Sequence, residues 1–368
     1  MIQISPETQL FIREHSSDDV RALALQAKKY PDINMPTAIT QIAGRQVAAE
    51  KIPSWREIEE IWYPKHLSLE QCSSEITARY KARLFQGDSL IDLTGGFGID
   101  CSFLATGFKT ATYVERQEEL CEIAAHNFPI LNLNHINVRN EDGVAYLQSM
   151  SPVDCIFLDP ARRNEHGGKT VAISDCEPNV AELEALLLSK ANRVMIKLSP
   201  MLDLSLALKE LKHTQEVHIL SVNNECKELL ILLGQTSPAE IAIHCVNLFT
   251  KGTQEEQHFV FTREQEQRSQ CTYTDSLGDY LYEPNASLLK AGAFRSIAAA
   301  YPVRKLHPNS HLYTSDSFIE NFPGRIFRIA NQCSLNKKEV KENLADLKKA
   351  NVTVRNFPAT VTELRKRL

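Results

Sequence analysis

The chain has 368 residues, a hydrophobic fraction of 43% and a charged fraction of 24%, values typical of a globular protein with two or three domains. The net charge of −5 argues against a protein that binds nucleic acid over its whole surface, so any such binding requires a local basic patch. No run approaches the roughly 18 apolar residues that cross a bilayer, and the start, MIQISPETQLFIREH, lacks the features of a signal peptide. We therefore expect a cytoplasmic protein with no membrane partner.

The cysteine pattern excludes two common stabilising devices. The nine cysteines form an odd set without a CxxC pair or a CxxC…HxxxH spacing, so neither a disulfide framework nor a structural zinc site is indicated. We expect most of them to be buried thiols, and we predict no bound metal. The oligomeric state is not determined by the sequence.

The pattern of apolar residues changes at about residue 86. Before it, segments such as DVRALALQAKKY and EITARYKARLF follow the helical period, with prolines between them, so we expect a helical region over residues 1–85. From Ser89 onward, short apolar runs alternate with segments compatible with helices, the pattern of a parallel sheet with crossover helices. The last two runs, EVHILSV and KELLILLG, are separated only by NNEC, so we expect an antiparallel hairpin.

These elements predict an α/β fold with a Rossmann-like sheet over residues 86–235. The runs IAIHCVNLF and HFVFTRE, joined by TKGTQEEQ, predict strands in a small β-rich segment over residues 236–295. In residues 296–368, KKEVKENLADLKKA places Val340, Leu344 and Leu347 on one helical face, and VTVRN alternates as a strand does. We therefore expect a small C-terminal α+β domain.

The segment LIDLTGGFGID predicts a cofactor loop. After a strand over residues 90–93, Thr94, Gly95, Gly96 and Gly98 form a tight turn in which an adenosyl ligand can lie against bare backbone, near the N–H groups of the next helix. Asp92, at the strand end, is placed to meet a positively charged part of such a ligand, directly or through water. Taken alone, the glycine loop fits a simple strand-to-helix turn equally well.

Two further acidic positions follow the next two strands. In ATYVERQ the strand ends on Glu115, about 20 residues beyond the loop, where a carboxylate accepts ribose hydroxyls, and we group its neighbour Arg116 with it. In NVRNEDGVAYL, Asp142 stands where an adenine amino group usually lies, and Gly143 leaves room for the ring. The alternatives are a solvated acid at a helix start for Glu115 and an N-cap for Asp142. Three acids in register favour the cofactor interpretation.

The fourth strand ends in CIFLDPARR, at the edge of the sheet where substrates bind. We expect Asp159 to align the reacting group and accept a proton, with Pro160 fixing the turn and Arg162 beside it. Arg163, and Lys197 in the strand RVMIKL, are candidates for substrate binding. An ordinary Asp-Pro turn and solvated arginines are the alternatives.

Over residues 86–233 these motifs resemble class I S-adenosylmethionine-dependent methyltransferases, including those that modify ribosomal and transfer RNA. The resemblance implies a seven-stranded methyltransferase sheet with an antiparallel last strand, and S-adenosyl-L-methionine as cofactor. DPAR is similar to the acceptor motif of RNA 5-methyluridine enzymes, but Ser199 and Pro200 stand where those enzymes carry a catalytic cysteine. Arg162 stands where amine-methylating enzymes carry an aromatic ring. The acceptor atom therefore stays open.

Along nearly its whole length the chain is similar to a bacterial family of methyltransferases with a C-terminal THUMP-like domain. The matching segments are LSLEQCSSEITARYK, LIDLTGGFGID, LDPARR, KLSP, NNECKELL and the last helix-strand unit. This resemblance implies that residues 236–295 are ferredoxin-like, that residues 296–368 are THUMP-like, and that RNA is the substrate. We expect another strand after VTELRKRL, so the last domain is predicted to be truncated.

The same resemblance adds two positions to the predicted site. Ser74, which lies with Ser73 and Glu75 just before the first strand, is expected to help close over the cofactor. Glu225, at the tip of the last hairpin, is expected on the acceptor side, although it is more often a simple turn carboxylate.

Other functions stay open at this point. The fold does not guarantee chemistry, so the chain could be an RNA-binding protein that keeps a non-catalytic methyltransferase scaffold. The acidic net charge also fits a methyltransferase of proteins or small molecules. An NAD-dependent oxidoreductase competes for the glycine loop, but DPARR and the reversed last strand argue against it.

Overall fold

The structure of the protein is a computed structural model, which describes residues 4–162, 172–345 and 347–366. The chain divides into two compact units, which we describe separately. Unit 1 consists of residues 1–217 and 228–239, and unit 2 of residues 218–227 and 240–368, so the division passes through two strands of one hairpin. Among the residues that the structure describes, no helix combines the length and apolar character needed to cross a membrane.

The N-terminal region of unit 1 is helical, as predicted. It contains α1 (Pro6–Glu14), α2 (Val20–Leu25), the 3-10 helix η1 (Ala27–Lys29), α3 (Met35–Lys51), α4 (Pro53–Arg56), α5 (His66–Gln71) and α6 (Glu75–Leu84). Pro6, Pro36 and Pro53 all lie in the first turn of a helix, where the missing N–H has no intrahelical partner to lose. The prolines therefore start these helices.

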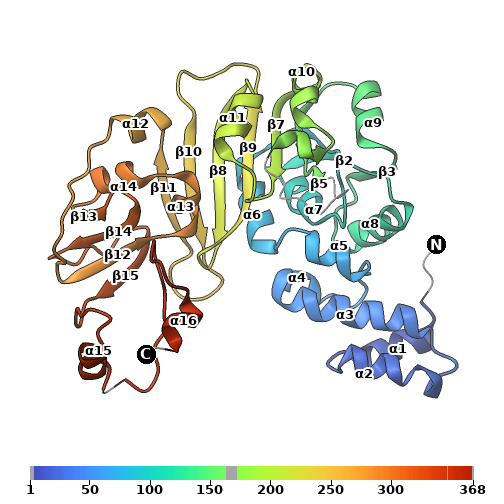
Figure 1. Cartoon of the computed structure of the whole chain (residues 1–368). Helices are drawn as coiled ribbons and strands as arrows, with labels where there is room; N and C mark the ends of the chain where they lie inside the picture. Colours follow the sequence, from blue (N-terminus) through green and yellow to red (C-terminus); the bar gives the residue numbers. More distant parts are fainter. Residues whose placement is uncertain (1–3, 163–171, 346, 367–368) are drawn as a thin grey trace. The chain divides into compact units, whose positions relative to one another are not determined.

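The helical region is followed by the predicted α/β sheet (Figure 1). Its first seven strands are β1 (Gly87–Asp92), β2 (Phe108–Glu115), β3 (Ile136–Asn140), β4 (Val153–Leu158), β7 (Ala191–Leu198), β8 (Thr214–Val222) and β9 (Glu225–Gly234). They hydrogen-bond in the order β3-β2-β1-β4-β7-β9-β8. The neighbours from β3 to β7 are parallel, whereas β9 is antiparallel to β7, with Val194 opposite Leu233. The antiparallel last strand is thus confirmed.

Crossover helices connect these strands. They are α7 (Ile99–Ala105), α8 (Glu118–Ile130), α9 (Gly143–Ser149), α10 (Val180–Lys190) and α11 (Leu204–Glu210), with the short elements β5 (Ala161–Arg162), η2 (Ile173–Asp175) and β6 (Cys176–Glu177) after β4. Between β8 and β9 only a turn remains, in which Asn223 and Asn224 both have positive φ, 50° and 68°. Asparagine tolerates this left-handed conformation in tight hairpin turns. The predicted hairpin forms for this reason.

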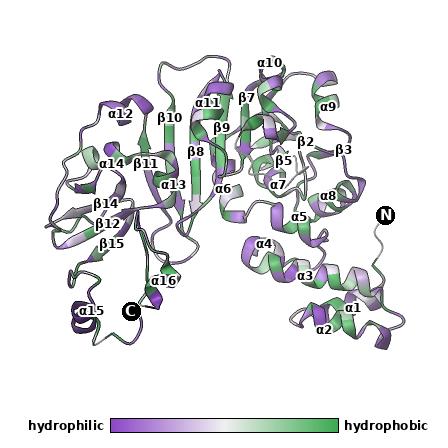
Figure 2. Ribbon diagram, viewed as in Figure 1, coloured by the Kyte–Doolittle hydropathy of each residue, from purple (hydrophilic) through white to green (hydrophobic). Residues whose placement is uncertain are grey.

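The core of unit 1 lies along β4, β7 and β9. From Glu228 to Gly234 every residue of β9 is buried, the pattern of a strand covered on both faces. Figure 2 shows β9 as a mainly hydrophobic strand. Glu228 is the first residue of this buried stretch and the only charged residue in it.

The sheet has nine strands, two more than predicted. The additional strands β10 (Ala242–Leu248) and β11 (Glu256–Phe261) continue the order as β8-β10-β11 and pair antiparallel with each other. The prediction had assigned this hairpin to a separate small segment. An uncovered β8 would present a row of unpaired backbone N–H and C=O groups, which pairing with β10 satisfies.

The rest of unit 2 contains a second, four-stranded antiparallel sheet in the order β13-β14-β12-β15. Its strands are β12 (Tyr280–Pro284), β13 (Arg304–His307), β14 (Ser310–Ser315) and β15 (Gly324–Arg328), and its helices are α12 (Arg263–Arg268), α13 (Ala286–Ala291), α14 (Phe294–Ala300), α15 (Lys337–Leu344) and α16 (Val361–Arg365). The strand predicted for VTVRN was wrong, since none of residues 352–356 lies in a strand. None of the described strands pairs with them, and alternation alone does not make a strand. α15 also ends before Leu347, which is exposed.

Candidate active site

The predicted cofactor loop follows β1 at its carboxyl end. Its glycines are required for different structural reasons. Gly96 and Gly98 have φ of 55° and 85°, in the left-handed region that favours glycine. A Cβ on Gly95 would lie 2.2 Å from the Tyr113 ring, so only glycine fits between the loop and β2. A Cβ on Gly96 would meet nothing closer than the Thr94 carbonyl oxygen at 3.7 Å. This open backbone at Gly96 fits a cradle for a ligand.

Glu115 holds this loop in place. Its Oε2 accepts a hydrogen bond from the backbone N–H of Gly96 at 2.9 Å, and its Oε1 accepts one from Gln117 at 2.8 Å. The side chain is buried, which excludes the alternative of a freely solvated acid. Arg116, in contrast, is exposed and lies 3.4 Å from a Glu177 carboxylate oxygen.

Asp142 is the N-cap of α9, the alternative considered above. It is exposed, and its Oδ1 accepts hydrogen bonds from the backbone N–H groups of Val144 and Ala145, each at 3.0 Å. A Cβ on Gly143 would lie 2.2 Å from the carbonyl oxygen of Leu93, so glycine is needed for α9 to approach the end of β1. The cap and the close approach put this helix start beside the cofactor loop.

Asp92 is a buried acid at the end of β1. Burial raises the pKa of its carboxyl to about 8, the backbone N–H of Thr94 acts against this shift, and the carboxylates of Asp100, Asp159 and Glu115 add to it. Each of these three carboxylates disfavours a further negative charge on Asp92. A cation placed here would be stabilised by these carboxylates.

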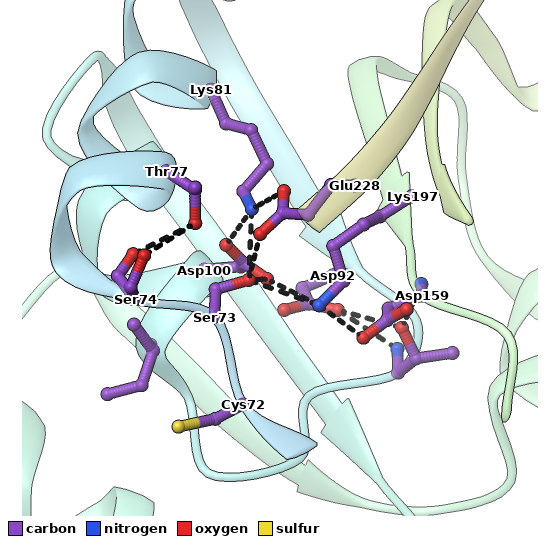
Figure 3. Close-up of polar contacts among 12 residues, drawn as sticks. Cys72, Ser73, Ser74, Thr77, Lys81, Asp92, Asp100, Asp159, Lys197 and Glu228 are labelled. Atoms are coloured by element: carbon purple, nitrogen blue, oxygen red, sulfur yellow. Dashed lines mark hydrogen bonds and ion pairs between the residues drawn. The ribbon is translucent and has the colours of Figure 1, made fainter. Parts of the chain in front are cut away.

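Next to Asp92 lies a buried charged cluster, which we define as Ser73, Lys81, Asp100, Lys197 and Glu228 (Figure 3). Its members come from the start of α6, from α6 itself, from the first turn of α7, and from β7 and β9. All five are buried, and Lys81 has no exposed side-chain surface. Buried charges need partners, so the cluster has to assemble as one unit.

Ser73 is the centre of the buried charged cluster. Its hydroxyl donates to Asp100 Oδ2 at 2.7 Å and accepts from the ammonium groups of Lys81 at 2.9 Å and Lys197 at 3.1 Å. Lys81 Nζ also lies 2.9 Å from Asp100 Oδ1 and 2.6 Å from Glu228 Oε2. The hydroxyl thus uses its one proton and both lone pairs on charged partners.

The cluster reaches the predicted acceptor motif through Lys197. Lys197 Nζ lies 2.6 Å from Asp159 Oδ2, and the Asp159 backbone N–H donates to Thr94 Oγ1 at 2.6 Å. The Asp159 side chain is 36% exposed, whereas that of Lys197 is 8% exposed. The structure therefore joins the loop after β1 to the end of β4, with Asp159 on the open side.

Charges set the protonation of this pair. Burial alone would lower the pKa of Lys197, but the carboxylates of Asp159, Asp100 and Glu228 outweigh it and hold that pKa well above its usual range. Burial raises the pKa of Asp159, while Lys197 opposes the rise. Lys197 thus stays a cation, and Asp159 is a stronger base than an exposed aspartate.

The other predicted site residues lie outside the buried charged cluster. Ser74 Oγ lies 3.2 Å from Thr77 Oγ1, outside the buried charged cluster that its neighbour Ser73 centres. Pro160 is buried, and the backbone of Arg162 pairs with Cys176 in the β5-β6 ladder. Arg163 lies outside the described residues. Glu225 is exposed in unit 2 and pairs with Lys227 at 2.7 Å.

Lys81, Asp100 and Glu228 were not predicted from the sequence. One signal was present: Lys81 lies four residues after Thr77 on the buried face of α6. Glu228 follows Lys227 and precedes the apolar run LLILL, so the pattern does not mark it as buried. A charge at a position where periodicity predicts an apolar side chain indicates a buried ion pair or a site. Asp100, directly after the glycine loop, gave no such signal because helix starts favour acids.

Comparisons with known proteins agree with this geometry. A family model described as protein-L-isoaspartate(D-aspartate) O-methyltransferase matches residues 56–164, one described as a ferredoxin-like domain matches 280–323, and one described as THUMP domain-like matches 324–368. The crystal structure of a candidate methyltransferase from Porphyromonas gingivalis W83 is 34% identical, covers 100% of this chain and 92% of its own, and has a TM-score of 0.85. No curated protein matches the chain.

Smaller solved structures are similar over part of the chain. An rRNA methylase from Streptococcus thermophilus matches 43% of this chain and 93% of its own, at 13% identity and a TM-score of 0.32. A candidate methyltransferase from Streptococcus mutans, solved in complex with SAH, matches 44% and 96% respectively, also at 13% identity and a TM-score of 0.32.

The sheet order with β9 reversed between β7 and β8, and the glycine loop at the end of β1, define a class I S-adenosylmethionine-dependent methyltransferase. Its cofactor is S-adenosyl-L-methionine. At 34% identity over its whole length, the chain belongs to the family of the Porphyromonas gingivalis protein. In this chain the enzyme domain is joined to a C-terminal THUMP-like domain.

The buried charged cluster generates a stability prediction. Lys81→Met leaves Glu228 and Asp100 without their shared ammonium, and we expect it to lower the free energy of unfolding by about 3–5 kcal/mol in urea titrations. Lys65→Met, which removes an exposed ion pair with Glu119, serves as the control and should cost less than about 1 kcal/mol. Adding Glu228→Met to Lys81→Met should restore part of the loss. Equal small effects of both lysine variants would contradict this account.

Proposed function

We propose that this protein transfers the methyl group of S-adenosyl-L-methionine to a base in ribosomal or transfer RNA in the cytoplasm. The observation that carries the choice of RNA is local charge at the C-terminal end of unit 2. Over described residues 337–345 and 347–366, eight exposed basic side chains accompany three acids, although the whole chain has a net charge of −5. The basic residues are Lys337, Lys338, Lys341, Lys348, Lys349, Arg355, Arg365 and Lys366, and the acids are Glu339, Glu342 and Glu363.

The basic segment coincides with the THUMP-like match over residues 324–368. Basic side chains on a solvent-facing surface bind the phosphate backbone of a nucleic acid and release counterions, whatever the base sequence. The location in the cytoplasm is supported by the nine cysteines, all free thiols, as is usual in a reducing compartment.

The cofactor is proposed to lie over the carboxyl ends of β1 and β2. The residues that would hold it are Ser74, Asp92, Thr94, Gly95, Gly96, Gly98, Glu115, Arg116, Asp142 and Gly143. Two ammonium groups and three carboxylates meet at the buried charged cluster and Asp159, which leaves one net negative charge close to Asp92. This charge and the open Gly96 backbone support a cationic adenosyl ligand. When bound, the cofactor supplies an electrophilic methyl group on a positively charged sulfur.

Asp159 is the proposed catalytic residue, with Pro160 and Arg162 completing the motif. Its carboxylate is held on one side by Lys197 and is open to solvent on the other, so one oxygen is available for an N–H group of the base. A raised pKa brings an aspartate closer to the pH at which it accepts protons most efficiently. Arg163, Lys197 and Glu225 stay candidates for substrate contacts, with Lys197 acting on substrate through Asp159.

Replacement of Asp159 tests this mechanism. Asp159→Asn keeps the size of the side chain but removes the proton acceptor, so methyl transfer to RNA should fall by about 10²–10⁴-fold. Binding of S-adenosylmethionine, measured by calorimetry, should weaken by about tenfold or less, because Asp159 is only one of the carboxylates around Asp92. The control is Asp154→Asn at the opposite end of β4, where the side chain only caps the backbone N–H groups of Asp88 and Ser89. Full activity of Asp159→Asn would exclude Asp159 as the base.

Cofactor binding should depend on pH through Asp92. Because the pKa of this buried acid is raised to about 8, it must lose a proton to pair with the cationic cofactor. We expect affinity to rise by up to about tenfold per pH unit from pH 6 towards pH 8, and to level off above it. The raised pKa of Asp92 affects the free energy of unfolding in the opposite direction. The stability that it contributes is fully present below pH about 4 and is lost as the pH rises through 8.

Calorimetric titrations across this range, with Asp92→Asn as comparison, measure the effect. The variant should bind more weakly and with a flat pH profile. A flat profile in the wild-type protein would show that Asp92 does not meet the cation.

The RNA proposal is tested with two matched pairs of adjacent lysines. Lys337→Glu with Lys338→Glu should weaken RNA binding at least about tenfold and reduce its dependence on salt, because phosphate contacts are lost. Lys28→Glu with Lys29→Glu changes the same charge on the exposed surface of η1, and should have little effect. Filter binding of total RNA at several salt concentrations provides the measurement. Equal binding by both double variants would contradict an RNA surface at this end of the chain.

A second candidate is a protein methyltransferase, favoured by the family model that matches residues 56–164 and is described as a protein O-methyltransferase. Incubation of cell extract with labelled S-adenosylmethionine separates the candidates. Label that nuclease treatment removes supports RNA, and label that only protease removes supports protein. Cofactor-independent RNA binding without any transfer would instead support a non-catalytic scaffold.

A further inference from the structure

Three histidines lie on one face of neighbouring strands in unit 2. His218 is on β8, His244 on β10 and His258 on β11, and these strands are adjacent in the sheet order. In the β10-β11 ladder, Val246 is opposite His258 and Val260 is opposite His244. The two histidines are therefore diagonal neighbours on the same face.

The imidazole nitrogens of these residues approach each other closely. His244 Nδ1 lies 3.1 Å from His258 Nε2. The rings of His218 and His244 have centroids 4.3 Å apart at an interplanar angle of 11°, and a nitrogen of each lies within 4.8 Å of the other. His218 is 2% exposed, His244 is half-buried and His258 is exposed. The row thus runs from the interior of the unit to solvent.

We propose that His218, His244 and His258 form a binding site for one divalent transition-metal ion of the zinc class. Two nitrogens that bind the same tetrahedral zinc at about 2.0–2.1 Å are about 3.3 Å apart, close to the 3.1 Å between His244 and His258. Imidazole nitrogen is a common ligand of zinc, copper and nickel, whereas magnesium and calcium bind mainly oxygen ligands. Three histidines leave a fourth position for water.

The gap between His218 and His244 fits the same site. A nitrogen of each ring lies within 4.8 Å of the other, and rotation about the side-chain torsions would direct both towards a shared ion. Metal binding there would tie β8, β10 and β11 together through side chains as well as backbone. These histidines are far apart in the chain and match no short ligand spacing, so the sequence does not indicate the site.

The alternative is a row of stacked imidazoles in which His244 and His258 share a proton. This arrangement needs no ion and produces no saturable metal binding. The two explanations therefore differ in one direct measurement, which does not involve methyl transfer or the cofactor.

The experiment uses the full-length protein, stripped with a chelator and titrated with Co²⁺ followed by absorption, and with Zn²⁺ in competition. We expect saturation at one ion per chain with a ligand-field spectrum that lacks a thiolate-to-cobalt band, since the site contains no cysteine. His258→Ala, at an exposed position, and His244→Ala should each weaken binding at least about tenfold. His66→Ala, which removes an exposed histidine of α5, is the matched control and should leave binding unchanged.

Zn²⁺ should also raise the thermal midpoint of the wild-type protein and of His66→Ala, but not that of His258→Ala. Absence of saturable binding would overturn the proposal. A thiolate band, or unchanged affinity in both His244→Ala and His258→Ala, would do so as well, because either result places the ion elsewhere.

Discussion

The hydroxyl of Ser73 is the point on which the buried charges of unit 1 depend. It lies between two lysines and an aspartate, and through them it connects α6, α7, β7 and β9. Removing any one partner leaves a charge without compensation in a place that water does not reach, which is far more costly than an unmade surface contact. The relative positions of these four elements are therefore restricted to those in which the cluster closes.

This restriction extends to the proposed reaction site. Lys197 belongs to the cluster and also contacts Asp159, so the position of the Asp159 carboxylate depends on α6, α7 and β9 as well as on β4 and β7. The cofactor loop is set in the same manner: Glu115 binds the Gly96 N–H, and the Tyr113 ring excludes a side chain at Gly95. A site prepared in this way needs little reorganisation when its ligands bind.

The predictions from sequence succeeded where a local pattern has one structural solution. The strand ends at Asp92, Glu115 and Leu158 follow from short apolar runs that stop at acids or proline, and the NNEC hairpin follows from chain length alone. The predictions failed where the outcome depends on a partner strand. VTVRN alternates as a strand does, but no described strand pairs with it. β10 and β11 extend the main sheet because β8 would otherwise present unpaired backbone groups.

The sequence by itself determined the class of fold and the positions of the glycine loop and of the LDPARR turn at strand ends, because periodicity and glycine positions are properties of consecutive residues. Only the tertiary structure decided that Ser73, rather than its neighbour Ser74, lies at the centre of the buried charged cluster. It also decided that Lys81 and Glu228 are partners of Asp100. These residues are up to 155 positions apart, from Ser73 to Glu228, and they meet only because β9 inserts beside β7 while α6 packs against α7. No local signal encodes such a meeting, since it results from the packing of whole elements.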